Sequence, residues 1–241
     1  MNNIHIPPVV KNLLIINVLF FAATFMFTTD QGNYLLVEQC AVFYFDSPFF
    51  RIWQPITYMF MHSPQNLAHI FFNMFALFMF GGVLESRWGA KRFLVFYLIT
   101  GLGALGLQWA VQAFEVYQIA GSAIPGEALS KISGLTMNQV QTLQGIYGGP
   151  MLGASGAVFG LLVAFGMLYP NTEMFIMFIP VPIKAKYLIP VYIIFELSLG
   201  VARVPGDSVA HYAHLGGALI GFILVKLWKD KDNNRFYRYY E

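Results

Sequence analysis

Polar side chains lie inside several of the most hydrophobic segments of the chain, at spacings that could support catalysis. His69 and Asn73 are four residues apart, which would place them on one face of a helix. Ser155 stands in a run of small residues, and His211 and His214 are three residues apart in a later hydrophobic segment. Acyl transfer requires a nucleophilic hydroxyl, a base that takes its proton and further hydrogen-bond donors, and these residue types could supply them.

The composition of the chain indicates a membrane protein. Hydrophobic residues make up 57% of the 241 residues and charged residues only 11%, whereas a soluble domain carries about a quarter of its residues as charged side chains. Lipid must therefore cover much of the surface. The net charge of +2 is too small and too dispersed to indicate nucleic acid binding. The single cysteine, Cys40, excludes an intrachain disulfide and a multi-cysteine metal site.

Six hydrophobic segments are candidates for transmembrane helices, each of which needs about 17–25 residues to cross a bilayer. Five stretches contain no Asp, Glu, Lys or Arg, and a sixth is interrupted only by Glu196. We therefore predict an all-α membrane protein with a single domain, 1–241. When the segments are trimmed at proline and glycine, the predicted helices span about 11–28, 65–84, 92–113, 152–169, 187–202 and 209–228.

The distribution of Lys and Arg predicts the orientation, because these residues concentrate in cytoplasmic loops. With six spans, both ends of the chain lie on one side of the membrane. The two ends and the loops on their side carry eleven basic residues, whereas the opposite side carries three, Arg51, Lys131 and Arg203. Both termini are therefore predicted to be cytoplasmic. The long external loops are then about 29–64 and 114–151, and neither has the features of a separate domain.

The polar residues of three predicted helices should lie at a common depth. The second, fourth and sixth helices enter the membrane from the external side in this topology. His69, Ser155 and His214 fall about three to five residues inside these helices, which at about 1.5 Å per residue is a depth of about 5–8 Å. The side chains could therefore converge in one layer just below the outer surface.

Small residues on the fourth and sixth predicted helices favour this convergence. Gly156 and Gly160 form one small-xxx-small motif, and Gly217 and Gly221 form another. Taken alone, each motif is more typical of ordinary helix packing than of a functional site. Each motif forms a stripe of glycines without side chains on its helix. If these two glycine stripes face each other, the backbones can approach closely enough for Ser155 and His214 to share a hydrogen bond of about 2.6–3.2 Å.

At these residues the chain resembles the rhomboid family of intramembrane serine proteases. The motifs that carry the resemblance are His69-x-x-x-Asn73, Gly153-x-Ser155-Gly156 and Ala213-His214-x-x-Gly217-x-x-x-Gly221. They occur in the order found in the family, and the resemblance covers the six-helix core. A further short pattern after the second predicted helix, Glu85-x-Arg87, is also similar to the family.

The resemblance implies a role for each matching residue. Ser155 would be the nucleophile and His214 its general base, in a dyad that requires no aspartate. The backbone N–H of Ser155 and the side chains of His69 and Asn73 would form the oxyanion hole. Phe159 would pack against the catalytic imidazole, while Gly153, Gly156, Gly217 and Gly221 would support the site.

The chain also departs from the family pattern in three places. Phe159 stands where the family often has tyrosine, so a phenol hydroxyl is absent. Trp53-Gln54 stands where the first external loop of the family typically reads Trp-Arg, which removes a charge expected to anchor the loop at the lipid interface. The stretch 114–151 is longer than in compact members.

The expected activity is that of a serine-type endopeptidase in the lipid bilayer. It would hydrolyse peptide bonds in or near the transmembrane segments of single-span or multi-span membrane proteins. A substrate helix would have to unwind locally, because its carbonyls are otherwise hydrogen-bonded within the helix. The site should line a polar cavity open to the external face. No cofactor and no metal are expected, and the expected location is a bacterial cytoplasmic membrane.

Two other functions use the same residues. A non-catalytic rhomboid-like protein could bind membrane helices, although such proteins usually lack the serine or the histidine. A transporter or channel could line a pathway with the same side chains, but the inner halves of the second, fourth and sixth helices are nearly all apolar.

Other features have structural interpretations. The glycine pattern 101–106 resembles a dinucleotide-binding motif but lies in an apolar helix with no preceding strand, which favours helix packing. His62 and His211 are interpreted as structural hydrogen-bonding residues. Glu196 has no assigned partner; a structural role is favoured, with hydrogen bonding near the cavity or tuning of a moving fifth helix as the alternatives.

Overall fold

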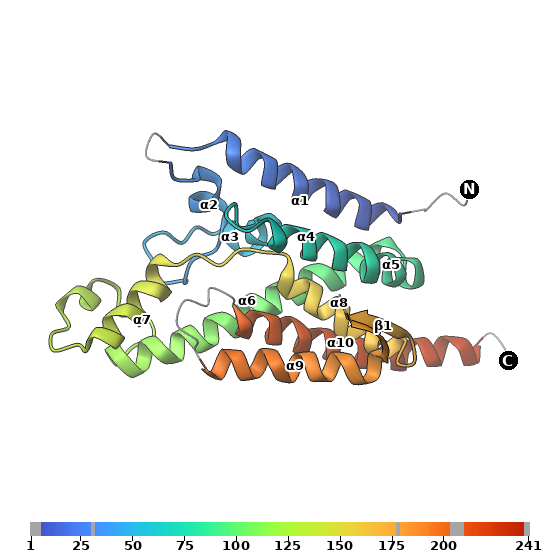
Figure 1. Cartoon of the computed structure of the whole chain (residues 1–241). Helices are drawn as coiled ribbons and strands as arrows, with labels where there is room; N and C mark the ends of the chain where they lie inside the picture. Colours follow the sequence, from blue (N-terminus) through green and yellow to red (C-terminus); the bar gives the residue numbers. More distant parts are fainter. Residues whose placement is uncertain (1–5, 30–31, 177–178, 203–209, 239–241) are drawn as a thin grey trace.

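The computed structural model describes residues 6–29, 32–176, 179–202 and 210–238, and this part of the chain is mostly helical. The long helices lie side by side, and α2, α3 and α7 gather at the end opposite to the start of α1 (Figure 1). The helices are α1 (Pro8–Met26), α2 (Leu35–Cys40), α3 (Gln54–Thr57), α4 (Leu67–Ala76), α5 (Gly82–Trp88), α6 (Ala90–Ala120), α7 (Met137–Gly148), α8 (Ser155–Leu168), α9 (Ala185–Ala202) and α10 (His211–Arg238).

Each of the six predicted segments overlaps a helical run of the structure, with ends that differ by up to ten residues. Within the described residues, four helical runs are long and apolar enough to cross a membrane: α1, Leu67–Trp88, α6 and α9. The run Leu67–Trp88 joins α4 to α5 through a π-helical turn at Leu77–Gly81. α8 is apolar but has only 14 residues. Arg203, one of the predicted external charges, lies outside the described residues.

A short hairpin adds to the helices where the sequence predicts only a loop. Strands β1 (Glu173–Ile176) and β2 (Ile179–Lys184) pair antiparallel between α8 and α9. Glu173 lies opposite Lys184 in this register, and opposite charges across a strand pair favour it. The pairing satisfies backbone groups of the segment that joins α8 to α9.

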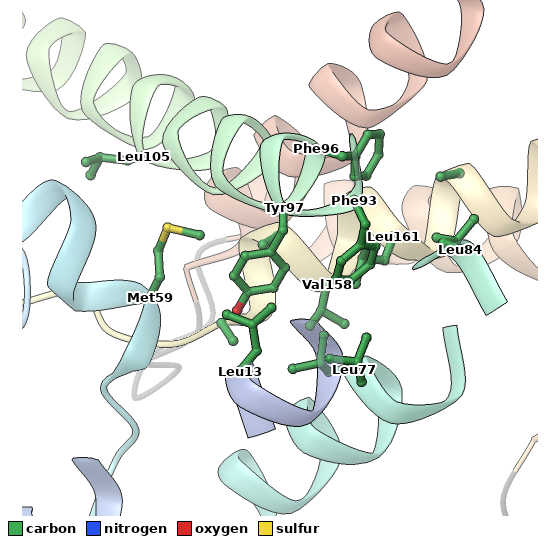
Figure 2. Packing of buried hydrophobic residues seen from close by; sticks show 14 of the residues in the cluster. Leu13, Met59, Leu77, Leu84, Phe93, Phe96, Tyr97, Leu105, Val158 and Leu161 are labelled. Carbon is green, nitrogen blue, oxygen red and sulfur yellow. The ribbon is translucent and has the colours of Figure 1, made fainter. Parts of the chain in front are cut away.

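α8 lies at the centre of the helices. It contacts α4, α5, α6, α9 and α10, and nine of its 14 residues are buried. Figure 2 shows Val158 and Leu161 of α8 close to Phe93 and Tyr97 of α6, with Leu77 nearby. A helix that is apolar around its whole circumference is expected at such a central position. The start of α8, where Ser155 lies, is therefore held from several sides.

The glycine stripe of α10 faces the backbone of α8, whereas the glycine stripe of α8 faces α6. A Cβ atom on Gly217 would collide with the carbonyl oxygen of Gly156, and one on Gly221 would come within 2.8 Å of the carbonyl oxygen of Gly160. The two backbones are thus in direct contact, which side chains larger than hydrogen would prevent.

The glycines of α6 also serve packing. A Cβ atom on Gly101 would collide with the thioether of Met59, and one on Gly103 would collide with Ile220 of α10. The pattern that resembles a dinucleotide-binding motif therefore lies on a helix that other side chains cover.

The two predicted external stretches join in one cap. The hydroxyl of Tyr147 donates to Oδ2 of Asp46 at 2.8 Å, and the backbone N–H of Gly126 donates to the same oxygen at 3.1 Å. The hydroxyl of Tyr44 donates to the carbonyl of Ala123 at 2.7 Å. The segment 114–151, which the sequence left without a role, is therefore attached to the first loop.

Gln54 anchors the first loop by hydrogen bonds rather than by charge. Its side chain is fully buried, its Oε1 accepts from the N–H of Arg51 at 3.0 Å, and its Nε2 donates to the carbonyl of Phe49 at 3.1 Å. The neighbouring Trp53 donates from Nε1 to the carbonyl of Gln39 at 2.9 Å. A neutral amide thus holds the loop at the position where the family typically has arginine.

We expect Gly217→Ala to destabilise the protein, because the added methyl group would force α10 away from α8. Overpacking of this kind costs about 1–3 kcal/mol. The matched control is Gly82→Ala in α5, where a Cβ atom meets nothing within 4 Å and where alanine favours the helix. Thermal unfolding in detergent should show a lower midpoint for Gly217→Ala only; equal midpoints for the two variants would contradict the close contact.

We expect Tyr147→Phe to loosen the cap, because a hydrogen bond to a carboxylate is lost, at a cost of about 1 kcal/mol. Burial and the hydrogen bond to Asp46 raise the pKa of Tyr147. The stabilisation is therefore fully present below about pH 10, the ordinary pKa of tyrosine in an unfolded chain, and is lost as the pH rises through the higher pKa of the folded state. Limited proteolysis of 114–151 should be faster in Tyr147→Phe at neutral pH and unchanged in Tyr117→Phe, whose side chain is exposed. Equal proteolysis of the two variants would show that the bond to Asp46 does not hold the cap.

Candidate active site

Ser155 and His214 meet at the contact between α8 and α10. Nε2 of His214 lies 2.9 Å from Oγ of Ser155, although the two residues are 59 positions apart in the chain. Ser155 is the first residue of α8, and His214 lies in the first turn of α10. The direct backbone contact between the two helices brings these two turns within reach of each other.

Phe159 fixes the plane of the imidazole. Its ring is stacked on that of His214, with a centroid distance of 4.2 Å and an interplanar angle of 9°. Phe159 is one helical turn after Ser155, so α8 positions both the hydroxyl and the ring that covers its partner. The ring of Tyr192 on α9 lies 5.2 Å from that of Phe159 and extends this aromatic contact to a third helix.

Gly153 leaves a space that His69 and Ser155 border. Its φ of 132° lies in the region that favours glycine. A Cβ atom at this position would lie 2.9 Å from Nε2 of His69 and 3.5 Å from Oγ of Ser155. Both polar atoms thus lie beside one small volume, as a hydrogen-bond donor and a nucleophile that act on one carbonyl group would have to.

Asn73 lies on the same helix as His69, but it bonds within that helix. It is buried, and its Nδ2 donates to the backbone carbonyl of His69 at 2.8 Å. No hydrogen bond between Asn73 and Ser155 is present among the described residues. One amide N–H of Asn73 therefore donates within the helix, and the amide has a second N–H that can donate to another acceptor.

Glu196 of α9 contacts both histidines of α10, a contact that the sequence did not predict. Its Oε2 lies 2.9 Å from Nδ1 of His214 and 2.7 Å from Nδ1 of His211. All three side chains are buried, with exposed fractions of 5% for Glu196, 7% for His211 and 9% for His214. A sequence signal was present: Glu196 is the acidic residue that interrupts a predicted span, and a carboxylate in a span needs partners.

The same three residues are the group that could hold a metal ion among the described residues. One oxygen of Glu196 and one ring nitrogen from each of His211 and His214 lie within 4.8 Å of one another. Two imidazoles and a carboxylate are a donor set that zinc accepts. The short hydrogen bonds between them already satisfy these donors and acceptors without an ion.

A cavity with a mixed polar and apolar lining reaches this group from the side of His211. It has a volume of about 330 Å³ and is lined by residues of α6, α7, α9 and α10, among them Gln108, Gln112 and Gln141. Ser155, His69 and Asn73 are not part of its lining, so it differs from the cavity expected around the four polar residues. Water in this cavity would be close to His211 rather than to the hydroxyl of Ser155.

His62 lies beside His69 rather than in the hydrogen-bonded group. It is fully buried, and its ring centroid is 5.2 Å from that of His69. Burial, followed by the neighbouring His69, lowers the pKa of His62 to about 3. A neutral ring at this place can support the position of His69 without adding charge.

The arrangement as a whole places a nucleophile, a base and a carboxylate that contacts the base in a row. The hydroxyl of Ser155 contacts the imidazole of His214, whose other nitrogen contacts the carboxylate of Glu196. A nucleophile whose base is oriented by a third group has the geometry of an activated serine. Proteins that share this constellation share a reaction type only if the surrounding donors also fit.

The comparison with known families agrees with the motifs. The family model for the Rhomboid domain matches residues 50–229, which include every residue of the site. The chain belongs to the rhomboid family. It is accordingly an integral membrane protein.

Several curated rhomboid proteins are similar to this one. An uncharacterized mitochondrial rhomboid protein of Schizosaccharomyces pombe is 27% identical in an alignment of 212 positions that covers 76% of this chain and 53% of the relative. Mitochondrial Rhomboid protein 1 of Saccharomyces cerevisiae is 30% identical over 67% of this chain and 38% of the relative. Chloroplastic Rhomboid-like protein 11 of Arabidopsis thaliana is 29% identical over 74% of this chain and 53% of the relative.

The relatives differ from this chain in length, and their names give a cellular compartment. The matched part spans about half of their length or less. Their names place them in mitochondria and chloroplasts of eukaryotes, so they do not support the expectation of a bacterial cytoplasmic membrane for this rhomboid protein.

Proposed function

We propose that this rhomboid protein is an intramembrane serine endopeptidase that hydrolyses peptide bonds in or near the transmembrane segments of other membrane proteins. The observation that supports this most is the hydrogen bond of 2.9 Å between Nε2 of His214 and Oγ of Ser155. The proposal includes a single domain, 1–241, with six spans, both termini in the cytoplasm and the site near the external face.

In the proposed reaction a neutral His214 accepts the proton of Ser155 while Oγ attacks the carbonyl carbon of the scissile bond. The imidazolium then gives that proton to the leaving amine, and water hydrolyses the acyl-enzyme by the same steps. Stacking on Phe159 keeps the imidazole in the plane in which Nε2 points at Oγ.

The start of α8 favours the negative oxygen of the tetrahedral intermediate. Ser155 is the first residue of the helix, and N–H groups in the first turn of a helix have no partner within it. The helix dipole adds a partial positive charge at the same place. Nε2 of His69 and the second amide N–H of Asn73 are the side-chain donors proposed to complete the oxyanion hole.

The alternative, a rhomboid-like protein that binds membrane helices without cleaving them, keeps the fold but does not need the hydroxyl and the imidazole. Both are present here and hydrogen-bonded to each other. This contact favours the protease over the binding protein.

We expect Ser155→Ala and His214→Ala each to abolish cleavage of a single-span substrate in liposomes, with a loss in kcat of at least about 10³-fold. The matched control is Ser198→Ala on α9, because Ser198 is exposed and its hydroxyl donates to the carbonyl of Ile194 in its own helix. This control should cleave at the wild-type rate. Product from Ser155→Ala at the wild-type rate would end the proposal.

We expect Asn73→Ala to slow turnover by about 10²-fold, which is less than the loss caused by Ser155→Ala, because other donors to the oxyanion remain. The matched control is Asn17→Ala, since Asn17 is also buried and donates from Nδ2 to the carbonyl four residues earlier in α1, at 2.7 Å. Both variants lose this bond, so only a difference in kcat between them reports on the oxyanion hole. Equal kcat values for the two variants would remove Asn73 from it.

A further inference from the structure

We propose that Glu196 is a positioning residue of the site: its carboxylate holds the proton of His214 on Nδ1, so that Nε2 faces Ser155 as a base. The inference rests on the proposed protease function and deepens it from a serine and histidine pair to a group of three. It also gives His211 a place in the site, as a second donor that holds the carboxylate.

The first step is the location of the proton. Oε2 of Glu196 lies within hydrogen-bond distance of Nδ1 of both His214 and His211. An oxygen can carry only one proton, so at least one of the two imidazoles must donate to it. An ionised carboxylate that accepts from both nitrogens satisfies all three groups. The neutral imidazole of His214 then has its proton on Nδ1 and a lone pair on Nε2.

The second step is the contact with the nucleophile. With the proton on Nδ1, Nε2 of His214 accepts the hydrogen bond from the hydroxyl of Ser155 at 2.9 Å. The opposite tautomer would place N–H against the hydroxyl and leave no base. A carboxylate at Nδ1 thus determines which nitrogen can take the proton of the serine.

The third step is electrostatic. When His214 takes up the proton it becomes an imidazolium, and the buried carboxylate 2.9 Å away stabilises that charge. A carboxylate inside a span is costly unless it has donors. The bond from His211, at 2.7 Å, supplies a second donor from the same helix as His214.

The fourth step concerns the helix that carries the carboxylate. Ser155 lies on α8 and His214 on α10, but Glu196 lies on α9. The hydroxyl of Tyr212 on α10 donates to the carbonyl of Gly200 on α9 at 3.0 Å, and a Cβ atom on Gly200 would lie 3.2 Å from Cβ of His211. α9 and α10 are therefore in close contact one turn from Glu196, which keeps its carboxylate beside the imidazoles.

The test compares Glu196→Gln, Glu196→Asp and the control Ser198→Ala in the whole chain in liposomes. Glutamine keeps the size but loses the charge, and its amide can donate to Nδ1 and so stabilise the wrong tautomer. We expect kcat to fall by about 10²- to 10⁴-fold with KM nearly unchanged. Aspartate keeps the charge and should restore part of the rate. Ser198→Ala changes an exposed side chain two residues after Glu196 on the same helix, and should leave kcat within about threefold of the wild type.

A second measurement reports the proton directly. ¹⁵N NMR spectra of protein labelled at histidine distinguish a proton on Nδ1 from a proton on Nε2. The wild type should show His214 with the proton on Nδ1, and Glu196→Gln should move it to Nε2. Because this measurement needs no cleavage, it separates the two proposals: if Ser155→Ala cleaves normally the protease assignment fails, whatever the spectra show.

Three results would overturn the role of Glu196. The first is a kcat of Glu196→Gln equal to that of the wild type while Ser155→Ala is inactive. The second is a His214 proton that stays on Nδ1 in Glu196→Gln. The third is stoichiometric zinc in the purified protein, measured by elemental analysis, because an ion held by Glu196, His211 and His214 would occupy Nδ1 in place of the proton.

Discussion

The contact between the backbones of α8 and α10 is the constraint on which the rest of the site depends. Gly156 and Gly160 lie against Gly217 and Gly221 with no room for a side chain between them. Only at this separation can a short hydroxyl side chain on one helix reach an imidazole on the other. Because lipid offers no hydrophobic drive for helix association, close van der Waals packing of this kind is what holds membrane helices together. The same interaction thus stabilises the fold and brings together the two side chains that we propose to react.

The polar groups of the site are arranged so that each one has a partner. Oε2 of Glu196 is bonded to two imidazoles, and Nε2 of His214 to the hydroxyl of Ser155. In a low-dielectric environment an unpaired carboxylate would be costly, so this network is stable only when it is complete. The carboxylate also determines the direction of these hydrogen bonds, because an ionised carboxylate can only accept them. In the proposed arrangement, the proton positions that stabilise the buried network are also those that leave the lone pair of Nε2 facing the serine.

Much of the site follows from residue spacing along single helices. The four-residue spacing of His69 and Asn73 and of Ser155 and Phe159 places each pair on one face, and the structure keeps these pairs in adjacent turns. The partner of Glu196 could not be predicted in this way, because spacing along α9 says nothing about which neighbouring helix its side chain faces. The contact between Asp46 and Tyr147 in the cap could not be predicted for the same reason, since the two residues are 101 positions apart.

The sequence by itself determined that the chain lies in a membrane, where its long helices are, and which hydroxyl and imidazole belong to the family motifs. These properties depend on composition and on local periodicity, which a linear chain records directly. Only the tertiary structure decided that a carboxylate on α9 contacts the imidazole, that Asn73 bonds within its own helix and that a neutral glutamine anchors the first loop. Those outcomes depend on the rotation of each helix about its axis and on the packing of segments distant in the chain.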